Sequence, residues 1–355
     1  SDLRFKAKSP LRKKEEKIMK LRKIMAVLMA ASVAASLAGC GGSSSSGSSD
    51  SSSDSASSDS GKVYKIGICQ QLEHEALDQA TQGFEDACEE KFGKDNVTFD
   101  LQNGQGEQAN CATITNSFVA DNVDLILANA TTALQCAAAA TDSIPILGTS
   151  ITDYATALDI SDWNGSTGMN ISGTSDLAPI DQQEDMLVEL VPDVKTVGIL
   201  YCSAEPNSAY QAKLFEDALK EDGIEYKEYT AADSNEIQSV TTSAISECDA
   251  LYIPTDNTMA SNTEIINNIC LPAKVPVVAG EQGICAGCGI ATLSISYYDI
   301  GYKAGEMAYD ILENGKDIST MEIETAPNVT KMYNPTICEE LGIEVPDEYE
   351  AIEQE

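Results

Sequence analysis

The stretch ILYCSAEPNSAY, from Ile199 to Tyr210, changes character in its middle. Its first residues are apolar and predict a buried strand, and its last residues open a helical pattern that continues through Phe215 and Leu219. Small polar residues and a proline lie at the junction between the two. A buried strand that leads directly into a helix is typical of a parallel βα unit.

The same alternation runs through the chain from Lys62, and it occurs twice. The first run predicts strands at residues 63–70, 97–103, 123–130 and 144–150, and helices at 73–91, 107–121 and from about 132. The second predicts strands at 196–203, 224–230, 248–255 and 275–280, and helices at 208–221, 235–245 and from about 257. Landmarks recur between the runs, namely Gly67 with Gly198, Asp124 with Asp249, and Pro145 with Pro276. We therefore predict an α/β protein with two Rossmann-like lobes, each built on a parallel sheet.

The polar residues after the strands are candidates for a ligand site. In open parallel sheets, ligands bind beyond the carboxyl ends of the strands, so two facing lobes enclose a cleft lined by these segments. Ser208, with Gln211 three residues later, resembles a capping box, and the N–H groups of a helix N-terminus suit a carboxylate. Because no Arg follows Arg22, an anionic ligand group must rely on N–H groups, hydroxyls, amides or an occasional Lys.

The charge of the chain is unevenly distributed. Ten of the 22 Lys and Arg lie within the first 23 residues, whereas the chain from Cys40 onward holds 12 Lys, no Arg and 54 Asp and Glu. The formal net charge of that part is 12 minus 54, or −42. A field of this sign repels phosphate backbones, so we expect no nucleic-acid partner. The simpler interpretation is a solvated acidic surface that keeps the protein soluble.

The N-terminal segment predicts export and a lipid anchor. Read from Met19, it has a basic start, an apolar run of about fourteen residues and then small residues, which is typical of a secretory signal peptide. Residues 1–39 are therefore expected to be an upstream segment and a signal peptide. LAGC, ending at Cys40, resembles the lipobox of bacterial lipoproteins, which implies lipidation of Cys40; the alternative is an ordinary cleavage site. Residues 40–61 predict a Ser/Gly-rich tether.

No later segment has the roughly 18 continuous apolar residues that a spanning helix needs. We therefore expect an extracytoplasmic, soluble body that is attached to the bacterial cell membrane through the lipid alone.

Segments from about Ile66 to Pro346 resemble the ABC transporter substrate-binding proteins of the type I periplasmic-binding fold, and among them the binders of tryptophan and other aromatic amino acids. The resemblance is carried, in order, by QQLEHEALDQATQGFEDA, FVADNVDLILANAT, GTSDL, YCSAEPNSAYQ, YIPTDNT, VPVVAGEQG, ATLSISYYDIGYKAGEMA and ELGIEVP. It implies two lobes joined by a hinge of several crossovers. We expect an N-terminal lobe of residues 62–175 plus about 293–318, a C-terminal lobe of 176–292 plus about 319–347, and an acidic tail at 348–355.

The resemblance implies a protein that captures a small zwitterion, an aromatic or other apolar amino acid, and delivers it to an ABC permease. Two alternatives are a ligand sensor for a signalling receptor and a thiol oxidoreductase that uses CAGC, Cys285 to Cys288. We expect no catalytic residue, cofactor or metal, because His74 is the only His and the chain lacks both a G-x-S-x-G and a P-loop motif.

The resemblance also suggests which residues line the cleft. In the second lobe these are Ser203, Glu205, Asn207 and Ser208, with Ser203 and Ser208 holding a ligand carboxylate unless they are only turn and cap residues. Asp256 and Asn257 follow at the next strand end, where Asp256 either pairs with a ligand ammonium or caps a helix.

In the first lobe the expected contacts are Gln70, His74, Asp78, Ala130 and Thr131. A lone His is commonly structural, and the resemblance gives His74 equal standing as a contact for the ligand side chain. Further contacts are expected near the hinge: Asp176 and Glu281 either reach an ammonium or brace the hinge. Of Tyr297 and Tyr298, one packs and the other faces the cleft, and Tyr297 is our candidate.

Ten cysteines remain besides Cys40. An even number in an exported protein invites a disulfide framework, but Cys69, Cys202 and Cys248 lie in or beside apolar strands, where Cys acts as a small core residue. We expect few bridges. CAGC is compatible with a redox pair, a disulfide or half of a metal site, and the lack of a second C-x-x-C disfavours zinc.

Overall fold

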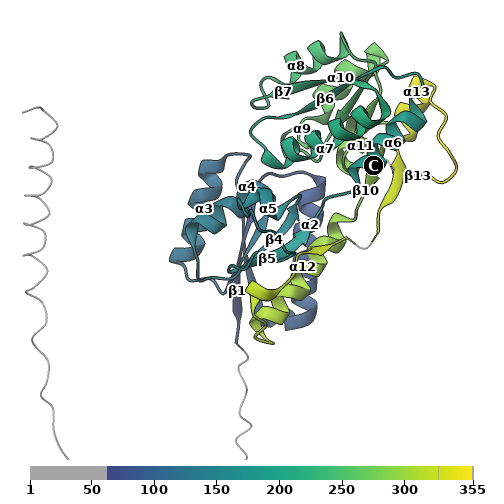
Figure 1. Cartoon of the computed structure of the whole chain (residues 1–355). Coiled ribbons are helices and arrows are strands. Elements are labelled where there is room, and N and C mark those ends of the chain that lie inside the picture. Colours follow the sequence, from purple (N-terminus) through teal and green to yellow (C-terminus); the bar gives the residue numbers. More distant parts are fainter. Residues whose placement is uncertain (1–61, 327, 354–355) are drawn as a thin grey trace, which may run out of the picture. The chain divides into compact units, whose positions relative to one another are not determined.

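The computed structural model describes residues 62–326 and 328–353, which form two lobes, each with one sheet and its covering helices (Figure 1). This architecture confirms the predicted α/β fold. The signal peptide, Cys40 and the tether lie outside the described residues. No helix of the described part is long and apolar enough to cross a membrane.

The first lobe is built on a six-stranded sheet in the order β11-β5-β4-β3-β1-β2, with every pair parallel. Its strands are β1 (Tyr64–Gln70), β2 (Val97–Asn103), β3 (Leu125–Asn129), β4 (Ile146–Ile151), β5 (Ile171–Ser175) and β11 (Glu324–Thr325). Its helices are α2 (Glu75–Phe92), η1 (Lys94–Asn96), α3 (Gln108–Ala120), α4 (Thr131–Ala140), α5 (Tyr154–Ala157), α12 (Tyr297–Leu312) and η2 (Ile318–Thr320).

The second lobe is built on a seven-stranded sheet in the order β13-β12-β10-β9-β8-β6-β7, in which only the β10–β12 pair is antiparallel. Its strands are β6 (Thr196–Cys202), β7 (Glu225–Ala231), β8 (Ala250–Ile253), β9 (Val277–Ala279), β10 (Ala291–Ser294), β12 (Thr330–Tyr333) and β13 (Glu350–Ala351). Its helices are α6 (Ile180–Leu190), α7 (Pro206–Asp222), α8 (Ile237–Ile245), α9 (Asn257–Ala260), α10 (Thr263–Ala273), α11 (Gln282–Cys288) and α13 (Pro335–Leu341).

The internal repeat read from the sequence is present in the topology. The five-strand orders β2-β1-β3-β4-β5 and β7-β6-β8-β9-β10 are the same. The landmark aspartates have equivalent roles: the Asp124 carboxylate accepts the Lys65 N–H at 2.9 Å, and the Asp249 carboxylate accepts the Thr196 N–H at 3.0 Å. In each lobe the aspartate therefore ties the start of the third strand to the start of the first.

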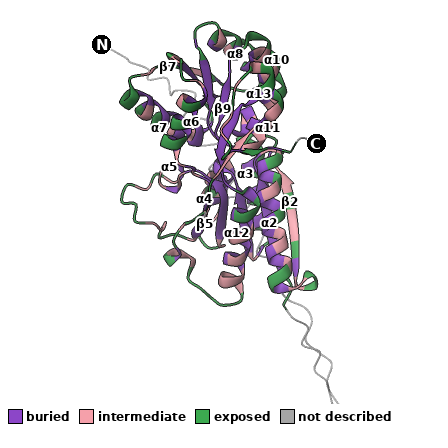
Figure 2. Cartoon of the chain, turned by 90° about the vertical axis from the view of Figure 1, so that its right-hand side faces the viewer, coloured by how far each residue is buried: buried purple, intermediate pink, exposed green. Residues whose placement is uncertain are grey.

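Buried residues concentrate along both sheets, while the helices expose their outer faces (Figure 2). β3 is buried at every position and β6 at all but its first, as expected for strands covered on both sides. In the second lobe, the rings of Phe215 and Tyr252 stack at 3.6 Å between centroids. Each lobe thus has its own core, so each is a stable platform for the residues at its strand ends.

The chain crosses between the lobes three times, after β5, after β10 and after β11. The second crossing delivers α12 to the first lobe, where it packs against α2 (Figure 1). The two helices pack closely because glycine has no Cβ at the contact. A Cβ on Gly301 would lie 2.0 Å from the Ala80 carbonyl oxygen, and one on Gly83 would lie 2.1 Å from that of Tyr298.

Two short strands differ from the expected lobe boundaries. β11 pairs with β5 of the first sheet, so the third crossing falls after residue 325 rather than near 319. β13 pairs with β12, so part of the stretch expected as an acidic tail adds a strand to the second sheet. Both strands have two residues, which is too short for a period-of-two pattern to be read from sequence.

Candidate functional site

The carboxyl ends of the two sheets meet at a small cavity between the lobes. Its volume is about 10 Å³, close to the smallest space that holds one water molecule. Seven of the expected site residues border this central cavity: His74, Asp176, Asn207, Asp256, Asn257, Glu281 and Tyr297. Four further residues complete its wall: Leu77, Ser150, Thr255 and Ala260.

Two larger openings flank the central cavity between the same lobes. The α3-side opening, about 460 Å³, lies between Gln105–Gln108 of the first lobe and Ala232–Ser234 of the second. The α11-side opening, about 880 Å³, shares His74, Ala260 and Glu281 with the central cavity. The three hollows together form the interlobe cleft.

Two buried carboxylates of the second lobe face the central cavity from helix N-termini. Asp256 is the N-cap of α9: one oxygen accepts the Met259 N–H at 2.8 Å and the other accepts the Cys202 N–H at 2.6 Å. Glu281 is the N-cap of α11 and accepts the N–H groups of Gly283 and Ile284. The cap role predicted for Asp256 is therefore present, and it leaves the carboxylate at the cavity wall.

A third buried carboxylate, Asp176, lies at the first crossover. The Tyr297 hydroxyl donates to Asp176 Oδ2 at 3.0 Å, whereas Oδ1 has no hydrogen-bond partner among the described residues. The Ser150 Oγ is buried and without a partner there as well. Ser150 has a left-handed backbone, with φ of +57°, which is uncommon outside glycine and is typical of functional sites. Two unsatisfied oxygens therefore belong to the wall of one cavity.

Burial raises the pKa of all three carboxyl groups. The pKa of Asp256 rises to about 8, with the neighbouring Glu205 carboxylate adding to the effect of burial, and that of Glu281 rises to about 7. The pKa of Asp176 rises to about 6, where the hydroxyls of Thr152 and Tyr297 oppose the effect of burial. Since no Lys or Arg borders the central cavity, a cationic ligand group would find three acidic groups and no competing cation.

His74 connects the two lobes across the cavity. Its Nε2 lies 3.0 Å from Asn257 Oδ1, while the Asn257 Nδ2 donates to Glu205 at 2.7 Å. Because Asn257 uses its Nδ2 on Glu205, its Oδ1 acts as the acceptor and His74 Nε2 as the donor. Burial lowers the pKa of His74, so the ring is neutral near pH 7.

Several expected site residues lie outside the central cavity. Gln70 donates to Asp78 at 2.6 Å and accepts the Thr81 hydroxyl at 2.7 Å, so Gln70 and Asp78 bind each other behind the first-lobe wall. Ala130 and Thr131 begin α4, where Ala130 has a left-handed φ of +84°. Neither borders the central cavity.

In the second lobe, Ser203 is exposed, and its N–H and hydroxyl both donate to the Ala231 carbonyl. Glu205 is buried and accepts from the N–H groups of Asn257 and Thr258, so it braces α9 and also borders the α3-side opening.

The predicted capping box at Ser208 is wrong. The helix α7 begins at Pro206, with Glu205 at the N-cap, which places Ser208 inside the first turn. Proline is favoured at this first helical position, and it moves the start of the helix two residues earlier.

Ser150 and Thr255 were missed by the sequence analysis. Both follow the pattern that located the other candidates, because each lies at the carboxyl end of a strand, in the segments GTS and PTDNT. Leu77 and Ala260 carry no polar group, so nothing distinguished them from core residues.

The ten cysteines of the described part are all free and buried, which agrees with a packing role. Cys285 and Cys288 lie on α11, and burial raises the pKa of both thiols well above the ordinary value. A redox pair needs an accessible thiolate, so this environment opposes the thiol-oxidoreductase alternative. The described residues contain no cluster suited to a metal ion.

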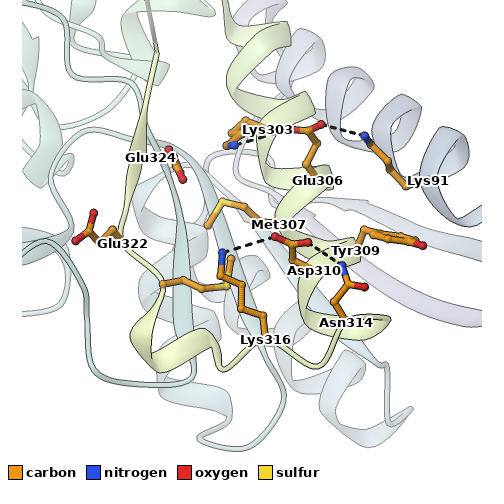
Figure 3. A pocket seen from close by; sticks show the side chains of 11 residues that line it. Lys91, Lys303, Glu306, Met307, Tyr309, Asp310, Asn314, Lys316, Glu322 and Glu324 are labelled. Atoms are coloured by element: carbon orange, nitrogen blue, oxygen red, sulfur yellow. Dashed lines mark hydrogen bonds and ion pairs between the residues drawn. The ribbon is translucent and has the colours of Figure 1, made fainter.

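A separate hollow of about 350 Å³ lies on the first lobe beside the C-terminal half of α12 (Figure 3). Its lysines are paired with acids: Lys91 with Glu306 at 3.1 Å, and Lys316 with Asp310 at 3.6 Å. Because these cations are already compensated and the strand ends point elsewhere, this hollow does not resemble a ligand site.

The fold and the cleft define a two-lobe binding protein. The family model for ABC transporter substrate binding proteins matches residues 65–354, and the chain belongs to this family. Members of this class act outside the cytoplasmic membrane and bind substrates rather than transforming them.

Two proteins of known ligand are more than 30% identical to this chain. A tyrosine-binding protein of Clostridioides difficile (strain R20291) is 35% identical over 289 residues, which is 81% of this chain and 83% of that protein. The crystal structure of an ABC domain in complex with L-Trp from Streptococcus pneumonia matches with a TM-score of 0.78 and 31% identity, covering 82% of this chain and 100% of that one.

A third relative, whose structure is open, allows the arrangement of the two lobes to be compared. It is the ligand-free, open structure of a substrate-binding protein with adhesive properties from Clostridium difficile, with 35% identity, the same 82% coverage of this chain, 100% coverage of that one, and a lower TM-score of 0.64. The higher score with the L-Trp complex indicates that the lobes of this chain are arranged more as in the complex than as in the open form.

Proposed function

We propose that this chain captures a zwitterionic amino acid with an aromatic or other apolar side chain in the interlobe cleft and delivers it to an ABC permease. The observation that carries the proposal is the pair of buried, unsatisfied oxygens, Asp176 Oδ1 and Ser150 Oγ, in the wall of one cavity between the lobes. Buried polar atoms without partners are rare in proteins, and a ligand would supply the missing ones. Relatives that bind tyrosine and tryptophan support the ligand class.

In this proposal the ligand ammonium donates to Asp176 Oδ1, and the Ser150 hydroxyl donates to the ligand carboxylate. Ser203, which is exposed, is a weaker candidate for the carboxylate than the sequence suggested. His74 and Tyr297 border the same space and are proposed contacts for the ligand side chain. Since the central cavity has room for about one water molecule, entry of an amino acid requires the lobes to separate and close again.

Lipidation of Cys40 would hold the protein at the outer face of the membrane. A binding protein anchored in this way would meet the permease in its own membrane without diffusing away. The lipobox-like sequence and the membership in this class support the proposal.

A thermal-shift screen tests the ligand class. The purified chain is unfolded and refolded to remove carried-over ligand, and then heated with each of the twenty amino acids, with sugars and with nucleosides. Ligand that binds only the folded state stabilises it by ~2.7 kcal/mol at a hundred times the dissociation constant. We expect the largest shift with Trp, Tyr, Phe or another apolar amino acid. A shift with a sugar or nucleoside, and with no amino acid, would overturn the proposed ligand.

A further inference from the structure

The interlobe cleft is acidic throughout. Nine Asp and Glu residues border its three hollows, and no Lys or Arg does. They are Glu73, Glu75, Glu107, Asp176, Glu205, Asp233, Asp256, Glu281 and Glu353. The one His of the cleft, His74, is a neutral donor to Asn257, so it supplies no positive charge. Burial keeps Asp176, Asp256 and Glu281 partly protonated near pH 7, and because no Lys or Arg borders the cleft, no fixed positive charge there repels a cation.

The hydrogen bonds of these acids are distributed unevenly. Asp256 and Glu281 each accept two backbone N–H groups of their own lobe, and Glu205 accepts those of Asn257 and Thr258. These contacts satisfy the oxygens but bring no cation. Asp176 is different, because its Oδ1 is buried in the wall of the cavity with no partner among the described residues. A donor is missing at this atom, and an ammonium that donates to it would favour the ionised form of Asp176.

The charges of an amino acid match the acidic cleft only in part. Its ammonium compensates one carboxylate, but its own carboxylate adds another negative group to a cleft that has no Lys or Arg to receive it. A primary amine that lacks the carboxylate brings the same ammonium and the same side chain without that repulsion. We infer that the cleft also binds primary amines, the decarboxylated counterparts of its amino-acid ligands, with an affinity at least equal to that for the amino acids.

This inference rests on the proposed function, since it uses the same cleft and the same ammonium contact. It extends the ligand class from zwitterions to cations. The Ser150 hydroxyl serves either ligand, because it can donate to a carboxylate or accept from an ammonium.

Calorimetric titration of the full chain, purified in detergent and stripped of ligand, tests the inference with matched probes. L-Tyrosine is compared with tyramine, which lacks the carboxylate, and with 3-(4-hydroxyphenyl)propionate, which lacks the amine; L-tryptophan, tryptamine and indole-3-propionate form a second set. We expect each amine to bind with a dissociation constant equal to or lower than that of its amino acid, and the acids to show no binding.

Each failure has a separate meaning. Amino acids that bind while their amines bind more than tenfold weaker would overturn the inference and leave the proposed function standing. Binding of the acids at the affinity of the amino acids would also overturn it, because the ammonium would then contribute nothing. If no member of either set binds, the proposed ligand class is overturned together with the inference.

A variant and a salt series locate the effect in the cleft. Asp176→Asn should weaken amine binding at least tenfold, whereas Asp193→Asn, at an exposed position between α6 and β6, should leave it unchanged. If Asp176→Asn does not fold, the wild-type chain still decides, because raising the salt concentration should weaken binding of the amine more than binding of the zwitterion. An equal salt dependence for the two ligands would contradict the inference.

Discussion

At the scale of single residues, the sequence shows which polar side chains follow a strand, but it does not show in which direction they point. The family resemblance, together with the strand-end pattern, selected His74, Asp176, Asp256 and Glu281, and all four border the central cavity. The same reasoning selected Gln70, which instead binds Asp78. Sequence does not show whether a polar side chain at a strand end points into the cleft or bonds to its own lobe, because that depends on the backbone directions of neighbouring elements.

The three buried carboxyl groups predict a pH dependence of stability. Their folded-state pKa values, about 6, 7 and 8, lie above the value of about 4 expected when unfolded. Between these limits the folded state binds more protons than the unfolded state, so its stability falls as pH rises from about 4 to 8. We expect Asp176→Asn to flatten the lower part of this slope, measured as the midpoint of thermal unfolding without ligand.

Ligand binding should have the opposite pH dependence. An ammonium beside Asp176 favours the ionised carboxylate, so affinity should increase as pH rises from 5 to 7 and protons should be released on binding. Calorimetry in two buffers of different ionisation enthalpy measures that release. Proton uptake over this range, or binding independent of pH, would show that the ammonium is not at this carboxylate.

The bond between His74 and Asn257 predicts an effect on closure. Removing the donor with His74→Phe should weaken the closed arrangement by ~1 kcal/mol, the typical value of one hydrogen bond, and raise the radius of gyration measured by small-angle scattering. His74→Gln retains an N–H donor and is the matched control. Equal scattering from both variants would mean that this bond does not hold the lobes together.

At the scale of elements, most helices and strands were predictable because their periodicity is strong. The strands at 97–103 and 196–202 match the predicted bounds to within a residue. The helix expected from about 257 is divided into α9 and α10, because Asp256 caps a single turn and a new helix begins at Thr263. The short strands β11 and β13 form by pairing with segments that are distant in the sequence, so no local pattern predicts them.

The contact between α2 and α12 predicts a packing defect. A methyl group at Gly301 would lie 2.0 Å from the Ala80 carbonyl oxygen, so Gly301→Ala should force the helices apart. Overpacking of this kind typically costs about 1 to 3 kcal/mol in the free energy of unfolding. Lys303→Ala on the same helix is the control, and it should change stability little. Chemical denaturation measures both, and equal stability of the two variants would contradict the close packing.

At the scale of the whole molecule, the lobes are two copies of one topology whose strand ends face a common cleft. The sequence predicted this arrangement because the alternation of strands and helices repeats together with its landmark residues, and the strand orders and the family match agree with it. The closeness of the lobes could not be predicted, since it depends on contacts between side chains of different lobes. The greater similarity to the L-Trp complex than to the open relative is a result of the structure alone.

The proposed anchor predicts where the protein is found in cells. With Cys40 intact the protein should fractionate with membranes, and Cys40→Ser should release it to the medium or periplasm because no thiol remains for lipidation. Cys69→Ser, a buried cysteine of the body, is the control and should leave the protein with the membranes. Wild-type protein that is not membrane-bound would contradict the proposed lipidation.

The central claim is that the lobes close on an amino acid held through its ammonium at Asp176. A crystal structure of the stripped protein with the amino acid that gives the largest thermal shift tests this claim most directly. The account predicts a ligand between the lobes, with its nitrogen within hydrogen-bond distance of Asp176 Oδ1 and its other end near Ser150. A ligand bound outside the interlobe cleft, or one whose carboxylate rather than ammonium faces Asp176, would contradict it.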